Sequence, residues 1–409
     1  MQIEHESTIT PSDRRRGRRL RIGIIGCGIA GMAAAIALRR GGHDVTIVER
    51  FAAARPVGAG LLLQPSGLQV LERLGAREDA ERWGAPIRAM DGRNARGRRV
   101  VDLDYGRLHG LGIHRAALFA VLHDRMQQSG ATLRLGFDVA AIDGTTLVSK
   151  SAGREGPFDL ILDCAGAHDA VRERIGPRGT AALYPWGCLW CALPDREGLW
   201  TGCLRQSYDG AHTMMGVLPI GRAPGADGPH VAWFWSLPLA EADAQRAAGL
   251  DVLKAKALAV WPQLATLLDA LTDFDQLALA TYRDVRMKPW RRDRVLVMGD
   301  AAHGTSPLLG QGANLALIDA VTLAYALRRA DNLGAALTLY EKLRRPHVAY
   351  YQLASRLATP AFQSYSKVLP WLRDTFLVAA RHMPIGGYIT RTTLQGIRKW
   401  PLGLWRLPD

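Results

Sequence analysis

The first part of the chain alternates short apolar runs with one helical stretch. The run "LRIGIIG" is rich in β-branched residues and predicts a buried strand, and the Ala-rich "GIAGMAAAIALRR" that follows predicts a helix. Gly41 and Gly42 end this helix, and "DVTIVER" predicts a second strand. Strand, helix and strand make a βαβ unit, whose right-handed crossover brings the two strands side by side and parallel.

Beyond the βαβ unit, the pattern predicts two kinds of region. Helical and strand-like stretches alternate at first; they are a helix at 68–74, a polar hairpin at 90–105, a helix at 115–129, and strands at 131–135 and 158–163. From Thr180 to Asp275, alternating runs such as "HVAWFWSLP" stand between turns rich in Pro and Gly, which is typical of an antiparallel sheet. "RVLVMGD" returns to the style of a parallel strand, and a long helix to about Arg329 and a mainly helical tail from Tyr350 follow.

Composition and charge are those of a folded protein of two or three domains. The 409 residues are 48% hydrophobic and 22% charged, with a formal net charge of +14. The positive charge is scattered and almost entirely Arg, and we find no nucleic-acid-binding pattern, so the charge suits anionic cofactors and substrates better than nucleic acid. The one concentrated stretch is "DRRRGRR" at 13–19, and residues 1–19 are predicted to form a disordered leader.

The sequence does not suggest secretion, membrane insertion or a metal site. No uninterrupted apolar stretch approaches the ~20 residues that a spanning helix needs, and the N-terminus lacks the order of a signal peptide. A cytoplasmic location is therefore expected. Cys188 and Cys191 form a C-x-x-C, but without a second pair the spacing favours two sheet residues over a zinc or redox site.

The first motif that carries chemistry is "GCGIAG", between the first strand and the first helix. Gly26 permits the tight turn, Gly28 lets the backbone approach a pyrophosphate, and Gly31 lets the helix pack close to the strand. The free N–H groups at the helix start face the phosphates, and Glu49 ends the second strand where an acidic residue accepts hydrogen bonds from a ribose. The predicted dinucleotide-binding residues are Gly26, Gly28, Ala30, Gly31, Glu49 and Arg50.

The second motif is "RVLVMGDAAHGTSPLLGQGANLALIDA", at 294–320. It resembles, nearly residue for residue, the C-terminal fingerprint of flavoprotein monooxygenases of the para-hydroxybenzoate hydroxylase family. The resemblance implies that Asp300 hydrogen-bonds the ribityl chain of a non-covalently bound FAD, that Pro307 lies near the flavin edge, and that the "GQGAN" backbone holds the pyrimidine end of the ring. The residues implied in that backbone are Gly310, Gly312, Ala313 and Asn314.

Elementary electrostatics supports this assignment. A glycine run at a helix start presents backbone N–H groups and the positive end of the helix dipole. Such preorganised donors would stabilise the negative charge of a reduced flavin, as they do at an oxyanion. His303 lies in the same run and is expected to make a structural or flavin-adjacent contact instead of acting as a base.

The third motif, "FDLILDCAGAHDAVRERIG", resembles the middle fingerprint of the same family and departs from it at an important position. The family has Ala-Asp-Gly, two residues, Ser and an Arg; here Ala165 stands at the Asp position, Asp169 at the Ser position, and Gly166 and Arg172 are retained. The family's Asp is implicated in FAD and NADPH contacts, which Ala165 cannot make. FAD binding is expected to survive on the other two motifs, and the departure bears on the reduction by NADPH.

The resemblance covers residues 20 to about 350 and implies a fold and its domains. The predicted fold is α/β: a Rossmann-like FAD-binding domain, an inserted antiparallel-sheet substrate domain and a helical C-terminal tail. Arg115 matches the Arg of a family helix near the FAD pyrophosphate, the alternative being an exposed helix Arg. The expected boundaries are 20–75, 97–178 and 280–345 for the FAD-binding domain, 76–96 and 179–279 for the substrate domain, and 346–409 for the tail.

The activity implied is hydroxylation of a phenol-like aromatic small molecule. NADPH or NADH would reduce FAD, and O₂ would give a C4a-hydroperoxyflavin that delivers one hydroxyl group. The substrate would lie between the flavin and the antiparallel sheet, with Pro307, Gln64 and Trp235 as the residues adjacent to the reaction. The candidate lining residues are Gln64, Trp186, Tyr208, Met215, Trp235 and Leu309, each of which could instead be plain core packing.

Two other functions remain open from the sequence, and a third is disfavoured. One is a flavin-dependent oxidoreductase or dehydrogenase without oxygen insertion, which Ala165 favours, and another is a non-catalytic flavin-binding protein. "WFWSLP" fits a halogenase motif superficially, but halogenases need a Lys in the N-terminal part, and the first Lys of this chain is Lys150. No nucleic-acid partner is expected, and a homodimer remains open.

Overall fold

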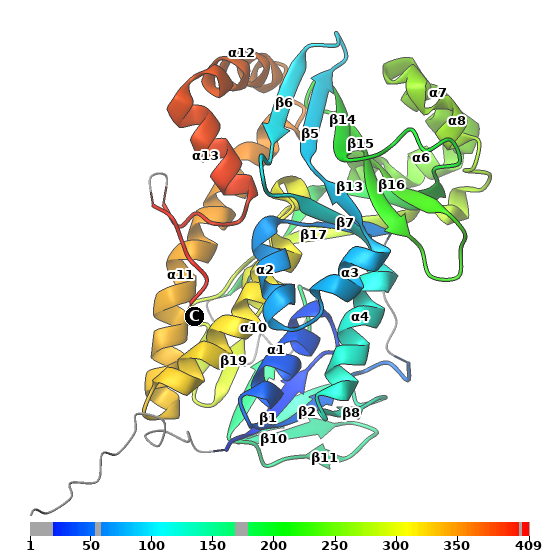
Figure 1. The fold of residues 1–409 in the computed structure, drawn as a ribbon. Coiled ribbons are helices and arrows are strands. Elements are labelled where there is room, and N and C mark those ends of the chain that lie inside the picture. The colour runs from blue at the N-terminus through cyan, green and yellow to red at the C-terminus, as the bar shows by residue number, and fades with distance from the viewer. Residues whose placement is uncertain (1–18, 54–58, 168–178, 401–402, 409) are drawn as a thin grey trace, which may run out of the picture.

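The computed structural model describes residues 19–53, 59–167, 179–400 and 403–408, and Figure 1 shows its fold. Most of the predicted leader, together with Asp169 and Arg172, lies outside the described residues. A parallel sheet lies at one end of the molecule and a larger sheet at the other, with a long pair of helices along one side. No helix among the described residues has both the length and the apolar character needed to cross a membrane.

The first sheet contains the predicted βαβ unit. Its strand order is β18-β19-β12-β1-β2-β8, and all neighbours run parallel except β18 and β19. The strands are β1 (Arg21–Ile25), β2 (Asp44–Val48), β8 (Thr132–Arg134), β12 (Leu160–Asp163), β18 (Arg291–Arg292) and β19 (Val295–Val297). Because both faces of a parallel sheet are covered, these strands are nearly continuous apolar runs, as in the fully buried β12.

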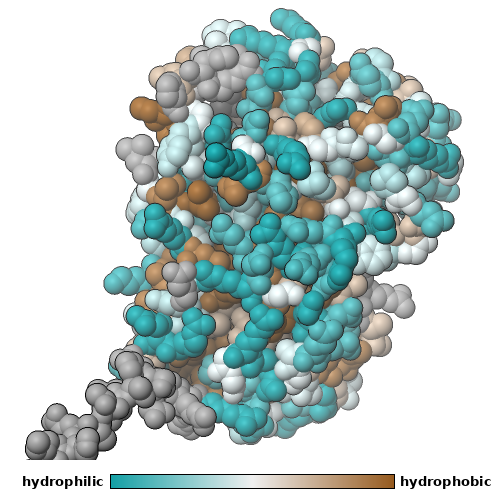
Figure 2. Space-filling view, in the orientation of Figure 1, coloured by the Kyte–Doolittle hydropathy of each residue, from teal (hydrophilic) through white to brown (hydrophobic). Residues whose placement is uncertain are grey.

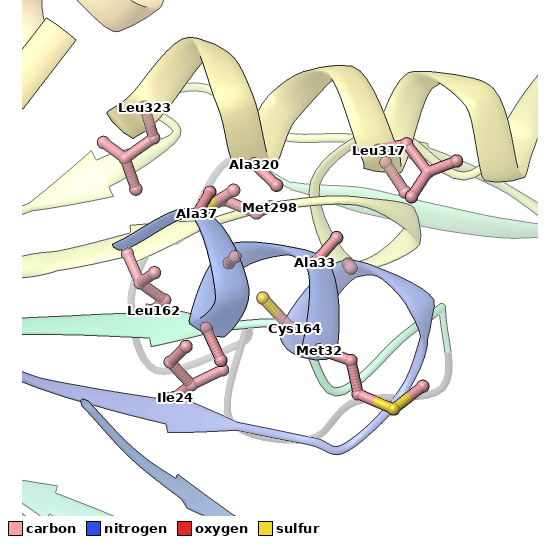
Figure 3. Close-up of a cluster of buried hydrophobic side chains, with 14 of the residues drawn as sticks. Ile24, Met32, Ala33, Ala37, Leu162, Cys164, Met298, Leu317, Ala320 and Leu323 are labelled. Atoms are coloured by element: carbon pink, nitrogen blue, oxygen red, sulfur yellow. The ribbon is translucent and has the colours of Figure 1, made fainter. Parts of the chain in front are cut away.

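Helix α1 (Ile29–Arg40) is buried along most of its length, because it lies between this sheet and α10 (Gly312–Arg329). Its Ala side chains let the two helices approach closely. Figure 3 shows Ala33 and Ala37 of α1 facing Leu317 and Ala320 of α10, above side chains of the sheet. The Ala-rich composition of α1 thus serves a tight helix–helix contact in the main core.

The second sheet has seven strands in the order β17-β13-β16-β15-β14-β5-β6. Its strands are β5 (Ala89–Asn94), β6 (Arg99–Asp104), β13 (Thr180–Pro194), β14 (Cys203–Asp209), β15 (Thr213–Arg222), β16 (Pro229–Pro238) and β17 (Ala278–Arg286). All pairs are antiparallel except the parallel pair β14 and β5. The predicted hairpin at 90–105 is confirmed, but β6 and most of β17 belong to this sheet, although the expected boundaries put them in the FAD-binding domain.

Both faces of the second sheet are buried. The far face is covered by α6 (Ala242–Ala248), α7 (Leu250–Val260) and α8 (Ala265–Leu268), and these helices were not predicted from the sequence. The near face packs with Leu62 and with Leu308 and Leu309, which lie in the loop between β19 and α10. The near face therefore points toward the predicted flavin side of the molecule.

A small three-stranded sheet joins the two large sheets. It is formed by β3 (Gly60–Leu63), β7 (Gly110–His114) and β4 (Ala85–Ile87). A Cβ added at Gly112 in β7 would lie 1.9 Å from the carbonyl oxygen of Pro219 in β15, so only glycine allows this approach. A further three-stranded sheet is made by β9 (Val139–Asp143), β10 (Thr146–Ser149) and β11 (Arg154–Glu155).

The remaining helices cover the edges and close the fold. Along the N-terminal half these are α2 (Pro65–Arg73), α3 (Arg77–Trp83) and α4 (Arg115–Gln128). The predicted helical tail is confirmed and consists of α11 (Leu333–Ala358), α12 (Val368–His382) and α13 (Pro384–Leu394). In Figure 1, α11 runs beside α10, and α12 and α13 lie at the end of the molecule where β5 and β6 stand.

Candidate functional site

The three sequence motifs meet at one edge of the first sheet. In each motif the residues predicted to bind the cofactor follow the carboxyl end of a parallel strand. These are the glycine turn after β1, Cys164–Gly166 after β12, and Gly299–Asp300 after β19. Glu49 follows the neighbouring strand β2. Open α/β sheets bind their ligands at this edge, so the topology brings together the residues predicted for cofactor binding.

The glycine turn is shaped by close contacts on two sides. Gly26 has a φ of 96°, and a Cβ there would lie 2.8 Å from the carbonyl oxygen of Cys164 in the third motif. A Cβ at Gly31 would lie only 2.0 Å from the carbonyl oxygen of Gly26. At Gly28 a Cβ would meet nothing within 4 Å. Gly26 and Gly31 are therefore required by the fold, whereas the space in front of Gly28 is open at the start of α1.

Glu49 is fixed beside this turn. Its carboxylate accepts hydrogen bonds from the backbone N–H of Cys27 at 2.8 Å and of Phe51 at 3.1 Å. Each carboxylate oxygen can accept more than one hydrogen bond, so the group can still receive a ribose hydroxyl. Arg50 is exposed and lies over the ring of Phe51, 4.5 Å from its centroid. Glu49 and Arg50 thus follow the carboxyl end of β2, beside the glycine turn.

The second motif lies directly against the first. A Cβ at Gly299 would be 3.0 Å from the Cβ of Ala30, so the end of β19 approaches α1 closely. The Asp300 side chain is exposed, and a Cβ at Gly312 would be 3.7 Å from its Oδ1 atom. The space at Gly310, which has a φ of 60°, is also open apart from the Gln64 amide at 3.5 Å. Asp300 therefore lies beside the start of α10.

Asn314 acts through its neighbours. It is fully buried; its Oδ1 atom accepts from the backbone N–H of Gln64 at 2.9 Å, and its Nδ2 atom donates to the carbonyl oxygen of Gly310 at 2.8 Å. Gln64 is fully buried too, and its Oε1 atom accepts from the hydroxyl of Tyr105 at 2.6 Å. Burial raises the pKa of this phenol well above its usual value. Asn314 therefore joins the residue after β3 to the glycine loop, and the Gln64 side chain is held by Tyr105 with its amide nitrogen beside Gly310.

A buried ionic network lies behind the second motif. Asp319 accepts from the backbone N–H of Gly299 at 3.0 Å, pairs with His303 at 2.6 Å and with Arg344 at 2.7 Å. Burial by itself would raise the pKa of Asp319, but the attraction of His303 and Arg344 outweighs it, and the pKa lies well below its ordinary value. His303 is 2% exposed and oriented by this pair, in keeping with the structural role expected for it.

Three hydroxyl groups hold the loop before Pro307. The Ser306 hydroxyl lies 2.7 Å from that of Ser355 and 2.8 Å from that of Thr359, and all three are buried. Pro307 begins the short 3₁₀ helix η5 (Pro307–Leu309) and is half-buried. The loop that the resemblance puts at the flavin edge is therefore anchored to the end of α11.

The C-terminal tail also holds the glycine loop, which the sequence did not reveal. The Gln311 side chain donates to the carbonyl oxygens of Leu394 at 2.9 Å and Thr393 at 3.3 Å. The backbone N–H of Ser66 donates to the carbonyl oxygen of Gln395 at 3.3 Å. No short motif signals these contacts, because each joins segments far apart along the chain.

Two of the predicted lining residues lie on the wrong side of the second sheet. Trp235 and Met215 belong to the far-face cluster under α6–α8, so the prediction that they adjoin the flavin and the substrate is corrected. Side chains alternate along a strand, and the near face of β16 and β13 is formed by Phe234 and Trp190, which stack at 5.2 Å. Tyr282 packs with the same near-face cluster.

The other predicted lining residues lie at different places. Tyr208 and Leu309 pack with the near-face cluster. Trp186 lies near the middle of β13, opposite Pro238 at the end of β16. It is in edge contact with Tyr365 at 4.9 Å, and its indole N–H donates to the carbonyl oxygen of His212. Leu309 is thus the predicted residue that links the near face to the glycine loop.

In the third motif, an exposed, uncharged residue stands where the resemblance implies an Asp. Ala165 is exposed, and its backbone N–H donates to the Asp163 carboxylate at 3.1 Å. Gly166 has a φ of 88°, and a Cβ there would meet nothing within 4 Å. Arg115 is exposed at the first position of α4, and its backbone N–H donates to the carbonyl oxygen of Ala59 at 3.1 Å.

The two cysteines of the C-x-x-C lie on opposite faces of β13, since Cys188 packs with the near-face cluster and Cys191 with the far-face cluster. Burial raises the pKa of Cys191 to about 12. Over the described ranges, no group of His, Cys, Asp and Glu is arranged to hold a metal ion. A cavity of about 320 Å³ beside Arg88, Asp195 and His230 includes none of the predicted site residues.

Fold and site together define a dinucleotide-binding flavoprotein with a separate sheet over the site. Residues 19–351 match the family model described as FAD binding domain, and the chain belongs to this family. It is 27% identical over 338 residues to a 2-heptyl-3-hydroxy-4(1H)-quinolone synthase of Mycobacteroides abscessus, covering 81% of this chain and 88% of that protein. It is 27% identical over 347 residues to an FAD-dependent urate hydroxylase of Klebsiella pneumoniae, with the same two coverages.

Among solved structures, 2-methyl-3-hydroxypyridine-5-carboxylic acid oxygenase in its tetrameric form superposes with a TM-score of 0.78. The identity is 22%, and the match covers 94% of this chain and all of the other. This likeness supports the fold, including the second sheet and the helical tail.

Proposed function

We infer that the protein is an FAD-dependent monooxygenase that uses NAD(P)H and O₂ to hydroxylate an aromatic small molecule. The observation that carries this is the meeting of the three fingerprints at the carboxyl edge of the parallel sheet. Membership of the FAD-binding family and the similarity to two enzymes that act on aromatic heterocycles support it.

The residues at this edge of the sheet suit FAD. Three glycines, Gly28, Gly166 and Gly310, leave room where a side chain would stand. We propose that Gly28 and the start of α1 hold the pyrophosphate, that Glu49 accepts from the adenosine ribose, and that Asp300 accepts from the ribityl hydroxyls. Arg50 and Arg115, both exposed near this edge, would add positive charge for the phosphates, and Ala30 and Gly31 would keep α1 close to the strand.

The start of α10 would hold the other end of the cofactor. The backbone N–H groups of Gln311, Gly312 and Ala313 come at the N-terminus of an 18-residue helix, and we propose that they face the pyrimidine carbonyl of the ring. The N–H of Gly310 donates instead to the carbonyl oxygen of Pro307 at 2.8 Å, which closes the turn before them. FAD, when bound, supplies hydride acceptance and the activation of O₂. The chain supplies fixed donors that favour the negatively charged, reduced state of the ring. Gln311 and Asn314 keep these donors in place from behind.

We propose a flat, electron-rich aromatic substrate, bound between the flavin ring and the near face. Trp190, Phe234 and Tyr282 of that face and Leu309 of the flavin loop offer an apolar wall that would exclude water from the reaction. Urate and the quinolone are the compounds named for the two similar enzymes, and both are flat heterocycles.

We also propose a cytoplasmic location, where NAD(P)H is available, and an assembly of identical copies. The second point rests on the likeness to an oxygenase with a tetrameric form. The molar mass of the FAD-loaded protein in solution tests it: a multiple of 44.6 kDa supports the assembly, and a monomer at every concentration contradicts it.

A second function, oxidation or reduction without oxygen insertion, is favoured by one residue. Ala165 follows β12 at the position where the resemblance implies an Asp. Without that carboxylate, a contact for the reductant is missing. This alternative shares the FAD site and differs in the fate of O₂.

Reduction without air tests the proposal. The protein is loaded with FAD and mixed with NADPH or NADH under argon, with and without a panel of phenols, hydroxyquinolines and purines. We expect bleaching of the yellow flavin, accelerated by at least one aromatic compound. Bound FAD that neither nicotinamide reduces with any compound contradicts the proposal, and Ala165→Asp then shows whether the missing carboxylate is responsible.

A further inference from the structure

Large apolar side chains are exposed in one part of the tail. Among the described residues, 18 large apolar side chains are exposed, and nine of them lie between Tyr365 and Leu404. They include Trp371 at 63% exposure, Phe376 at 62%, Ile385 at 66% and Trp400 at 62%. Scattered exposed apolar residues need no explanation, but half of them within the last tenth of a chain form a surface that fits an apolar partner. We call the nine exposed apolar residues from Tyr365 to Leu404 the tail surface.

The opposite side of α12 is firmly attached. The Arg373 guanidinium donates to the carbonyl oxygens of Gly210 at 3.0 Å and Ala361 at 2.9 Å, and lies over the ring of Tyr208. The Asp374 carboxylate accepts from the Asn94 side chain at 2.7 Å. Helix α12 is therefore anchored to the second sheet, and its exposed side chains are presented on a fixed frame. Figure 2 shows hydrophobic side chains on the outside of this end of the molecule.

The tail surface is also basic. Residues 361–409 contain seven Lys and Arg against two Asp and Glu, and two of the seven, Arg373 and Arg398, are buried. Lys367, Arg391 and Lys399 are exposed, and each stands next to or one turn from an exposed apolar residue. The β5–β6 hairpin, which packs against α12, adds exposed Arg96 and Arg98 at its turn. An apolar surface edged by cations thus lies at one end of the molecule.

The combination of exposed apolar residues and cations favours one of two possible partners for the tail surface. In a two-fold dimer through the tail surface, each patch would face its own copy, and the basic edges would meet like charges. An anionic lipid surface accepts both features: the apolar side chains enter the boundary between headgroups and acyl chains, and the cations meet the lipid charges. Trp and Tyr, which make up much of the tail surface, are the residues favoured at that boundary.

We propose that the tail surface binds a membrane that contains anionic lipids, with α12 and α13 lying on the bilayer. The proposal stands on the exposed apolar residues, the attached inner side of α12 and the excess of cations. It does not depend on the reaction that the enzyme catalyses.

Vesicle flotation with the full-length, FAD-loaded protein tests the proposal. The probes are vesicles of phosphatidylglycerol and phosphatidylcholine in equal parts, and vesicles of phosphatidylcholine alone. We expect flotation with the anionic vesicles, weakened by salt, and little with the neutral ones. The double variant Trp371→Ser/Ile385→Ser should reduce the affinity at least about tenfold, because it removes two inserted side chains. Leu199→Ser, at an apolar residue that is 53% exposed between β13 and β14, is the matched control and should bind as the wild type does.

The flavin spectrum and the melting temperature show that each variant is folded. Failure of the wild type to float at low salt overturns the proposal. So does equal flotation of the double variant, since attraction by the net charge of +14 alone would not depend on Trp371 or Ile385. A dimer in solution that the double variant dissociates would assign the tail surface to a second copy and would also overturn it.

Discussion

At the scale of single residues, two glycines of one motif are required for different reasons. Gly31 is required by the fold, because a Cβ would lie 2.0 Å from a backbone oxygen that cannot move away. Gly28 faces open space, so its absence of a side chain matters only when a ligand approaches. The sequence motif alone does not distinguish these two roles. The contacts around each glycine distinguish them.

The pair Gly28→Ala and Gly31→Ala tests this difference. We expect Gly28→Ala to unfold like the wild type without FAD and to bind FAD at least about tenfold more weakly, a loss of roughly 1.4 kcal/mol. Gly31→Ala should lower the melting temperature even without FAD, because the helix must move away from the strand. Thermal unfolding of the apoprotein and FAD titration by fluorescence quenching measure the two effects. A Gly28→Ala variant that binds FAD normally would contradict the placement of the pyrophosphate.

His347 makes stability depend on pH. Burial and the neighbouring Arg344 hold the pKa of His347 well below its usual value, so the ring is neutral: it accepts from Arg344 and donates to the carbonyl oxygen of Gly396 at 3.0 Å. Below about pH 6.5 the unfolded chain takes up a proton that the folded protein does not, and stability falls as the pH falls. Each buried, neutral His of this kind changes the free energy of unfolding by up to about 1.4 kcal/mol per pH unit.

We therefore expect His347→Gln to be less stable at pH 8 and to lose stability less steeply between pH 6.5 and pH 5. The pKa values of His43 and His114 are also lowered, chiefly by burial. These two residues contribute equally to the pH dependence of stability in the wild type and the variant. Urea unfolding at several pH values measures the difference. Identical slopes in wild type and variant would contradict the buried, neutral ring.

At the scale of elements, the contact between the glycine loop and the tail makes a direct prediction. Gln311→Ala removes both hydrogen bonds from the loop to the end of α13. We expect a lower melting temperature and FAD binding weakened severalfold, because the donors at the start of α10 are less firmly held. Thr390→Ala, at an exposed position of α13, is the control and should change neither. Unchanged FAD affinity in Gln311→Ala would show that the tail does not support the cofactor site.

The sequence predicted some elements well and others not, for physical reasons. The βαβ unit and the edge where the motifs meet follow from local patterns, so they could be predicted. The orientation of β16 could not, because Ala232 and Phe234 on one face and Trp233 and Trp235 on the other are all apolar. The strand is covered on both sides, and α6–α8, which cover the far face, were not predicted. Trp235 was consequently assigned to the wrong face.

At the scale of the whole molecule, the cofactor site depends on segments that lie far apart in the sequence. The tail reaches back to Ser66 and Gln311, and Arg344 and His347 both contact the ring of Trp405, His347 stacking on it at 4.4 Å. Such contacts follow from the relative placement of α2, α10 and α11, which no local pattern specifies. The tail was accordingly predicted as helical, but its support of the flavin loop was not.

The central claim is that O₂ supplies the oxygen atom added to an aromatic substrate. The direct measurement uses the FAD-loaded protein, NADPH or NADH, and the aromatic compound that most accelerates flavin reduction, under ¹⁸O₂. The hydroxylated product should carry one ¹⁸O atom and be two mass units heavier than the product formed under ¹⁶O₂. A product without label, or one formed equally well in the absence of O₂, would contradict the monooxygenase function and favour oxidation without oxygen insertion.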